Sequence, residues 1–212
     1  MASGSPPAER RLILLRHGAT AWNAEGRYTT RTDLPLSDAG LAQARASAAA
    51  LTDVRIDRIL CSPLRRARVT AETVAAAQPD GGPPIEVDGR LVEIDAGPFE
   101  GLTPAEIEAG PLAAAHAAWH RDVDPTAPEG TETLAAACAR ATAFLADAGR
   151  LAGTTLAATH GSFTRVLVAC AVLGADPAAH RRLWLDNGHW ATIAFADRPR
   201  LVEFNAGPAI DT

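Results

Sequence analysis

Apolar and polar positions follow one another in blocks along this chain, and the blocks predict short strands alternating with helices. Three short, mostly apolar runs are typical of buried strands: Arg11 to Leu15, Ile56 to Cys61 and Thr154 to Thr159. Each run stops at a polar break where a loop must begin. Shorter strands, or a closing hairpin, are predicted at Ile85 to Val87, Leu91 to Glu93, Trp190 to Phe195 and Leu201 to Phe204.

The intervals between these strands have helical spacing. Small and apolar residues repeat on one face from Asp38 to Leu51, and Ser37 can cap the first turn. Ser62-Pro63 predicts another helix start, a hydroxyl cap followed by proline at the first helical position, and this helix should run to about Ala77. Further helices are predicted over Thr103 to Arg121 with a break around Gly110-Pro111, over Thr131 to Ala148, and from His160-Gly161 through Leu173.

This alternation predicts an α/β fold of three layers, with a mostly parallel central sheet and helices on both of its faces. A chain of 212 residues is long enough to bury one sizeable core. We expect a single domain over residues 10–212, preceded by a disordered tail at residues 1–9. Residues 95–131 are expected to form a small helical cap inserted into that domain.

The net charge and the apolar runs of the chain argue against nucleic acid and membranes as binding partners. The formal net charge is −5, which argues against binding to nucleic acid or to an anionic membrane, because both need a basic surface. The longest apolar run, Val166 to Ala175, is too short to span a bilayer, and the N-terminus lacks a signal-peptide core. We therefore expect a cytoplasmic protein, which could act as a homodimer.

The cysteines support the same compartment. Cys61, Cys138 and Cys170 are odd in number, widely spaced and placed in apolar stretches. Neither a disulfide framework nor a metal knuckle can be read from that spacing. The sequence therefore predicts three buried free thiols in a reducing cytosol.

The candidate chemistry lies at the polar breaks. Ligands of such sheets bind outside the carboxyl ends of the strands. Three breaks fall at those ends: Arg16-His17-Gly18, Ser62 to Arg66, and His160-Gly161. If the three strands are neighbours, two histidines and two arginines converge on one crevice.

That convergence suits phosphoryl transfer, which is catalysed mainly by positioning and by cationic groups on the equatorial oxygens. Arg16 and Arg66 can donate paired hydrogen bonds to those oxygens. A neutral His17 can attack phosphorus and hold the group covalently, while His160 donates a third hydrogen bond. Glu93 is the best-placed carboxyl group to protonate the leaving alkoxide and later to activate water. No metal or cofactor is required.

Five segments carry a resemblance to a known family. They are LLRHGATAWNAEGRYTTRTDLPLSDAG (Leu14 to Gly40), CSPLRRARVTAETV (Cys61 to Val74), LVEIDAGPFEGLT (Leu91 to Thr103), APEGTETL (Ala127 to Leu134) and ATHGSFTRVL (Ala158 to Leu167). In their types and order they resemble the motifs of the histidine phosphatase superfamily, also called phosphoglycerate mutase-like.

The resemblance implies a phosphoglycerate mutase-like fold and a role for each matching residue. His17 matches the phosphate acceptor and Glu93 the proton donor. Arg16, Arg66 and His160 match the phosphate pocket. Other positions that contact substrate in the family correspond here to Asn23, Thr29 and Gly161.

Departures from the family pattern bear on the reaction. Cofactor-dependent mutases resemble this chain but carry a tyrosine where Ala96 stands and a lysine where Pro104 stands, and Thr30 replaces a usual glycine. Between Ile94 and Thr131 the only cation is Arg121. A pocket short of cations cannot readily retain a bisphosphorylated intermediate. We therefore favour a phosphatase acting on a small phosphorylated metabolite, with a phosphoglycerate mutase and a non-catalytic binding module as alternatives.

Several residues admit simpler interpretations. His116 and His120 lie four apart on a predicted helix, a spacing that can bind zinc, but no third ligand is evident and surface histidines are favoured. Asp95 and Glu100 are carboxylates that could replace Glu93. The tryptophans are expected to pack, with Trp119 the one candidate for a substrate wall.

Overall fold

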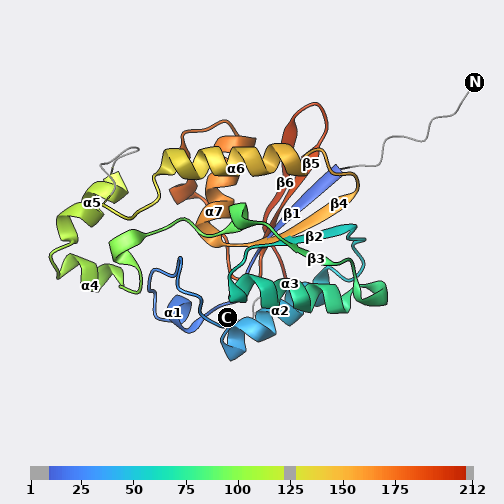
Figure 1. The fold of residues 1–212 in the computed structure, drawn as a ribbon, viewed down its shortest axis with the longest axis horizontal. Helices are drawn as coiled ribbons and strands as arrows, with labels where there is room; N and C mark the ends of the chain where they lie inside the picture. Colours follow the sequence, from blue (N-terminus) through green and yellow to red (C-terminus); the bar gives the residue numbers. More distant parts are fainter. Residues whose placement is uncertain (1–9, 122–127, 209–212) are drawn as a thin grey trace, which may run out of the picture.

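The computed structural model describes residues 10–121 and 128–208, and the predicted tail at residues 1–9 lies outside them. A central six-stranded sheet has the order β3-β2-β4-β1-β5-β6 (Figure 1). The strands are β1 (Arg10–Arg16), β2 (Arg58–Cys61), β3 (Ile85–Val87), β4 (Thr154–Thr159), β5 (Trp190–Phe195) and β6 (Pro199–Ala206). The pairs β3/β2, β2/β4 and β4/β1 are parallel, whereas β5 runs antiparallel to β1 and to β6. The predicted mostly parallel sheet is confirmed.

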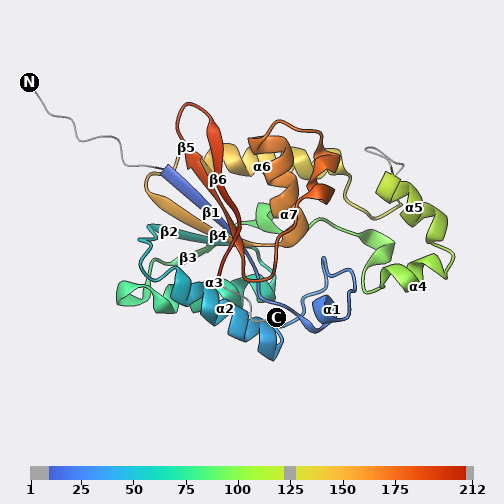
Figure 2. The same ribbon diagram turned by 180° about the vertical axis from the view of Figure 1, so that it is seen from behind.

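Helices cover both faces of the sheet (Figures 1 and 2). One face carries α2 (Asp38–Ala50) and α3 (Arg65–Ala77), and the other carries α6 (Leu134–Ala148) and α7 (Gly161–Val166), which continues into the π-helix η4 (Leu167–Val172). Successive residues of a strand point to opposite faces. On β1, Leu12 and Leu14 therefore join the α6/α7 core, while Ile13 and Leu15 join the α2/α3 core. An uninterrupted apolar strand is the sequence signature of a sheet buried on both sides.

One expected helix cap and one expected strand are wrong. The N-cap of α3 is Leu64, not Ser62, because the Ser62 hydroxyl hydrogen-bonds His160 across the sheet edge instead of capping the helix. Leu91 to Glu93 is not a strand. A 3-10 turn, η2 (Gly89–Leu91), begins at Asp88, whose carboxylate accepts from the Arg90 N–H, and the chain then leaves the sheet.

A cap stands at one end of the sheet (Figure 1). Its elements are α1 (Ala21–Ala24), η3 (Gly97–Phe99), α4 (Pro104–Glu108) and α5 (Ala113–Arg121). The predicted break around Gly110-Pro111 separates α4 from α5.

The cap packs around an aromatic cluster. The ring centroid of Tyr28 lies 5.7 Å from the ring centroid of His116 and 5.7 Å from that of Trp119. The ring centroids of Phe99 and Trp119 are 5.4 Å apart. The prediction of a surface histidine is wrong for His116, which is 6% exposed and hydrogen-bonds the Tyr28 hydroxyl through Nε2 at 2.9 Å. The side chain of His120 lies outside the described residues.

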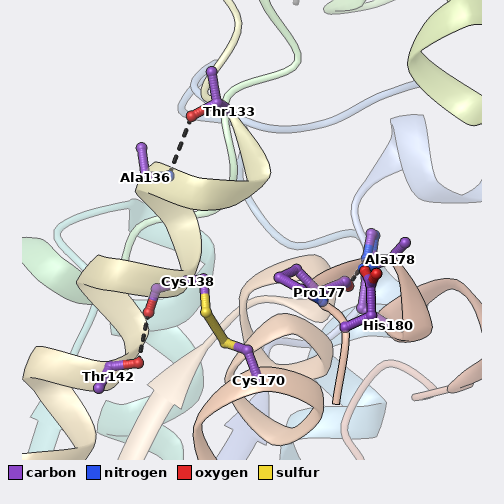
Figure 3. The surroundings of a disulfide bond; sticks show 9 residues. Thr133, Ala136, Cys138, Thr142, Cys170, Pro177, Ala178 and His180 are labelled. Atoms are coloured by element: carbon purple, nitrogen blue, oxygen red, sulfur yellow. Dashed lines mark hydrogen bonds between the residues drawn. A yellow bond between two sulfur atoms is a disulfide. The ribbon is translucent and has the colours of Figure 1, made fainter. Parts of the chain in front are cut away.

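The prediction of three free thiols is also wrong. Cys138 of α6 and Cys170 of η4 form a disulfide, with Cα atoms 6.2 Å apart (Figure 3), and Cys61 is the free, buried cysteine. The two half-cystines are 32 residues apart in sequence and meet because both helices pack on the same face of the sheet. Because these two cysteines are paired, they do not indicate a reducing compartment. A cytoplasmic location stays a prediction. Within residues 10–121 and 128–208, no helix is long and apolar enough to cross a membrane.

Candidate active site

Three strand ends meet at one edge of the sheet. Because β4 pairs with both β1 and β2 in parallel, the residues that follow these strands are neighbours. His17 and His160 are brought together there, with ring centroids 5.0 Å apart. Arg66, from the first turn of α3, reaches the same point. The predicted convergence of two histidines and two arginines is present in the structure.

The surroundings of His17 define its protonation. Its Nδ1 lies 2.7 Å from the Gly18 carbonyl oxygen, which can only accept, so Nδ1 carries the proton. The Arg66 Nε–H donates to His17 Nε2 at 3.2 Å. Burial, and then the charges of Arg66 and Arg16, hold the pKa of His17 well below its ordinary value. His17 is therefore a neutral imidazole with a lone pair on Nε2.

Arg66 is fully buried and is held by the backbone of the loop that contains Thr30 and Thr32. Its Nη1 donates to the Thr32 carbonyl at 2.8 Å and its Nη2 to the Thr30 carbonyl at 2.7 Å. These bonds hold Nε toward His17. Arg65, its neighbour on the helix, is exposed, so Arg66 is the arginine of this turn that reaches the site.

Arg16 and His160 each keep one buried polar atom without a partner among the described residues, Nε of Arg16 and Nδ1 of His160. Arg16 donates through Nη1 to the Leu185 carbonyl at 2.5 Å, and burial lowers its pKa to about 10, so it stays charged at neutral pH. The Ser62 hydroxyl accepts a hydrogen bond from the Leu64 N–H. It can donate its own proton to His160 Nε2, which lies 2.8 Å away. When this hydroxyl donates to Nε2, the imidazole proton lies on Nδ1.

Unpartnered donors in a buried site are costly, at about 1–3 kcal/mol each. The two unpartnered atoms, Arg16 Nε and His160 Nδ1, belong to side chains that were predicted to bind phosphate. Both side chains lie beside the neutral His17. A tetrahedral oxyanion would supply the missing acceptors. The arrangement is suited to an anion with several oxygens.

The Glu93 carboxylate is held by backbone N–H groups. Oε1 accepts from Ile94 and Phe163, both at 2.8 Å, and Oε2 accepts from Ser162 at 2.9 Å. Glu93 is 7% exposed and lies on the wall of the pocket described below.

The two competing carboxylates have other partners. Glu100 accepts from the backbone N–H groups of Thr30, Arg31 and Thr32, and Asp95 pairs with Arg31 at 3.2 Å. The Thr30 hydroxyl also bonds Glu100 and accepts from the Ala96 N–H. The threonine that replaces a usual glycine therefore anchors this loop.

An open pocket of about 480 Å³ adjoins these groups. Five predicted residues lie on its wall: Arg16, Asn23, Thr29, Glu93 and Gly161. His17, Arg66 and His160 are 3%, 0% and 0% exposed and lie deeper. Arg16 and Gly161, their chain neighbours, mark where the pocket meets the buried histidines.

Two glycines allow this close packing. A Cβ on Gly18 would lie 2.1 Å from the Gly40 carbonyl oxygen, so no other residue fits without moving backbone. A Cβ on Gly161 would lie 3.0 Å from Arg16 Nε, the atom without a partner. Gly161 thus leaves room beside that donor.

Cations from outside the 95–131 segment also reach the pocket, although one of them, Arg27, is paired with Glu25 and Glu106. Besides Arg16, the pocket wall includes Arg27 and Arg165, neither of which lies in the 95–131 segment. The spacing could have revealed Arg165, because it stands four residues after Gly161, one helical turn along α7. Trp184 was expected to pack, but it is 71% exposed and lines this pocket.

No group of three or more histidine, cysteine or carboxylate side chains that could hold a metal occurs in the described part of the chain. The zinc interpretation of the His116 and His120 spacing therefore gains no third ligand there.

A family model described as the histidine phosphatase superfamily (branch 1) matches residues 12–207. A glucosyl-3-phosphoglycerate phosphatase from Mycolicibacterium vanbaalenii is 40% identical over 124 residues, which are 58% of this chain and 53% of that protein, so this chain spans about half of that relative. A 2,3-bisphosphoglycerate-dependent phosphoglycerate mutase from Nitratidesulfovibrio vulgaris is 33% identical over 92% of this chain and 86% of that protein.

Solved structures extend the likeness to the whole fold. The structure of a mycobacterial glucosyl-3-phosphoglycerate phosphatase with VO3 matches with a TM-score of 0.81 and 31% identity, covering 93% of this chain and 100% of that one. The family match, the five motifs in order and the shared fold agree with one another. The chain belongs to branch 1 of the histidine phosphatase superfamily.

Proposed function

We propose that this protein is a phosphatase that hydrolyses a small phosphomonoester metabolite through a phosphohistidine on His17. The observation that carries the proposal is the neutral His17, with its Nε2 lone pair free of a proton beside the buried, unpartnered Arg16 Nε and His160 Nδ1. A nucleophile and two anion donors lie together at the end of one sheet, and the family match supports phosphoryl chemistry.

In the first step His17 Nε2 attacks phosphorus in line with the leaving oxygen. The N–P bond forms as the P–O ester bond breaks, and protonated Glu93 gives its proton to the departing alkoxide. Arg16, Arg66 and His160 bind the equatorial oxygens, where negative charge is spread. The Arg66 Nε–H, which bonds His17 Nε2, turns to a phosphoryl oxygen.

In the second step the Glu93 carboxylate takes a proton from water. The resulting hydroxide attacks phosphorus, the N–P bond breaks, and inorganic phosphate leaves. Glu93 is protonated again and His17 regains its lone pair, so the cycle closes without a cofactor. Asn23 and Thr29, on the pocket wall, contact the organic part of the substrate.

The test is phosphate release from a panel of phosphomonoesters by the wild type and by His17→Ala, each with and without a chelator. We expect wild-type turnover that survives chelation and at least a 1,000-fold loss in His17→Ala, because the covalent route is removed. His189→Ala, which removes another buried histidine, should keep most of the activity. Persistent turnover in His17→Ala would contradict the mechanism.

The same panel separates the alternatives. Phosphoglycerate isomerisation that depends on added bisphosphoglycerate and exceeds phosphate release would make the protein a mutase. Absence of turnover on every ester, together with binding that His17→Ala leaves unchanged, would favour a non-catalytic module.

A further inference from the structure

Ser62 directly follows β2 and contacts the second histidine of the site. Its N–H donates to the Ala158 carbonyl of β4 at 2.9 Å, next to the last residue pair of the parallel β2/β4 ladder. The side chain is 0% exposed, and its hydroxyl oxygen lies 2.8 Å from Nε2 of His160, the residue that follows β4. The pairing of the two strands therefore holds the hydroxyl and the imidazole against each other.

The two ring nitrogens of His160 have opposite roles. Burial is the largest of the causes that hold the pKa of His160 well below its ordinary value, so the ring is neutral. In a neutral imidazole one nitrogen donates a hydrogen bond and the other accepts one. Nδ1 is the nitrogen without a partner among the described residues. The position of the single proton therefore decides whether Nδ1 can donate to an anion.

An account of donors and acceptors favours the proton on Nδ1. The Ser62 hydroxyl accepts from the Leu64 N–H at 3.3 Å, and its own proton has His160 Nε2 as its acceptor within the described ranges. With the imidazole proton on Nε2, the hydroxyl proton and the Nδ1 lone pair would both lack partners. With that proton on Nδ1, only the Nδ1–H is left over, and a phosphoryl oxygen can accept from it. Buried polar groups without partners are costly, so the second arrangement is favoured.

His17 provides the contrast within the same site. Its Nδ1 donates to the Gly18 carbonyl oxygen at 2.7 Å, and a carbonyl oxygen can only accept. The main chain therefore fixes the proton of the nucleophile. The partner of His160 is a side-chain hydroxyl, which can be removed by substitution.

We propose that Ser62 is a positioning residue whose hydroxyl donates to His160 Nε2 and thereby keeps the imidazole proton on Nδ1, ready to bind the phosphoryl group. This inference rests on the proposed function, because it takes the transferred phosphoryl group as the ligand of His160. Ser62 acts through His160, since its hydroxyl is already engaged by Leu64 and by the imidazole. Without the hydroxyl, Nε2 loses its donor and the proton is shared between the two nitrogens.

The tautomer of His160 can be measured directly by NMR on protein that carries ring-¹⁵N histidine. A ring nitrogen with a proton and one with a lone pair have well-separated ¹⁵N chemical shifts, and the signals missing from His160→Gln identify those of His160. Spectra are recorded at about pH 8, where histidine is neutral, for the wild type, Ser62→Ala and Ser62→Thr. The same proteins are assayed for kcat/KM on a nitrophenyl phosphate and for inhibition by inorganic phosphate.

In the wild type we expect the His160 proton on Nδ1. In Ser62→Ala the Nδ1 and Nε2 signals of His160 should move toward each other as the tautomers mix, while those of His17, fixed by Gly18, stay in place. We expect kcat/KM to fall by about 10- to 100-fold, because part of one oxyanion donor is lost, and inhibition by phosphate to weaken.

Two further variants separate this role from simple packing. Ser62→Thr keeps a hydroxyl and should restore the His160 signals and most of kcat/KM. Ser47→Ala is the matched control, because Ser47 is another 0% exposed serine and donates to the Gly188 carbonyl. Its loss should leave the His160 signals in place.

Three results would overturn the proposal. The first is a wild-type spectrum with the His160 proton on Nε2, which would make Ser62 the acceptor. The second is an unchanged His160 spectrum in Ser62→Ala. The third is an equal movement of the His17 and His160 signals in that variant, which would assign Ser62 to support of the whole site. The tautomer is measured without turnover, so this failure is distinguishable from failure of the phosphatase proposal, which phosphate release and His17→Ala decide.

Discussion

The catalytic edge and the cap are built by different means. At the edge, His17, Arg66 and His160 are at most 3% exposed, and sheet strands or backbone carbonyls hold them in position. The cap instead rests on contacts between aromatic rings and on Arg181, which donates to the Trp119 carbonyl. The difference separates two tasks. In the proposed function the edge carries the phosphoryl chemistry, and the cap, whose Tyr28 and Pro104 line the pocket, contacts the leaving group.

The largest expected effect is at the edge and depends on the leaving group. Glu93→Gln removes the proposed acid, so kcat/KM on alkyl phosphates should fall by roughly 10²- to 10⁴-fold. A nitrophenyl ester needs little protonation and should lose far less in the first step. The measurement is kcat/KM for both esters, which reports the steps up to release of the alcohol, with Asp95→Asn, a neighbouring carboxylate paired with Arg31, as control. Equal losses on both esters would assign the acid elsewhere.

The next largest effect is expected on the free energy of unfolding, through the disulfide that joins α6 to η4. The disulfide of Cys138 with Cys170 closes a loop of 32 residues, for which chain entropy predicts a stabilisation of about 3–4 kcal/mol. Cys138→Ser with Cys170→Ser should lower the free energy of unfolding in urea by that order. Reduction with dithiothreitol should do the same in the wild type and should not affect the double variant. A fall in kcat without a fall in stability would instead link the disulfide to the site.

The buried histidines predict a pH dependence of stability, to which His116 of the cap should add because burial lowers its pKa as well. Burial holds the pKa of His17 and of His160 well below the ordinary value. The unfolded chain takes up these protons first as the pH falls below about 6.5. The free energy of unfolding should therefore decrease toward acid pH, by up to about 1.4 kcal/mol per pH unit for each histidine.

Urea unfolding between about pH 6.5 and 5 measures this slope, above the range where most carboxylates titrate. His160→Gln should reduce the slope, whatever its effect on stability at neutral pH. An unchanged slope would show that His160 is protonated in the folded protein, contrary to its environment.

The smallest effect is expected in the cap. Tyr28→Phe removes the hydroxyl that bonds His116 Nε2, at an expected loss of about 1 kcal/mol in the free energy of unfolding. Because Tyr28 lines the pocket, KM should change severalfold and kcat on a nitrophenyl ester much less. A loss in kcat as large as the loss in kcat/KM of Glu93→Gln would end the division between edge and cap.

Sequence reasoning was most successful where function and local structure share a few adjacent residues. Arg16 ends β1 and His17 follows it, and His160 directly follows β4, so parallel pairing alone brings them together. Arg66 is placed by the helix that begins just before it. Glu93 lies on the wall of the pocket, although the strand expected to carry it does not form, and its role as the acid stays a prediction.

What the sequence by itself determined is the order of strands and helices and the residue types at the strand ends, because periodicity and chain adjacency govern them. Only the tertiary structure decided the Ser62 bond to His160, the disulfide, the burial of His116, and the place of Arg165 on the pocket wall. Each of these joins segments distant along the chain, and its free energy depends on how helices and cap pack on the sheet, which no local pattern encodes.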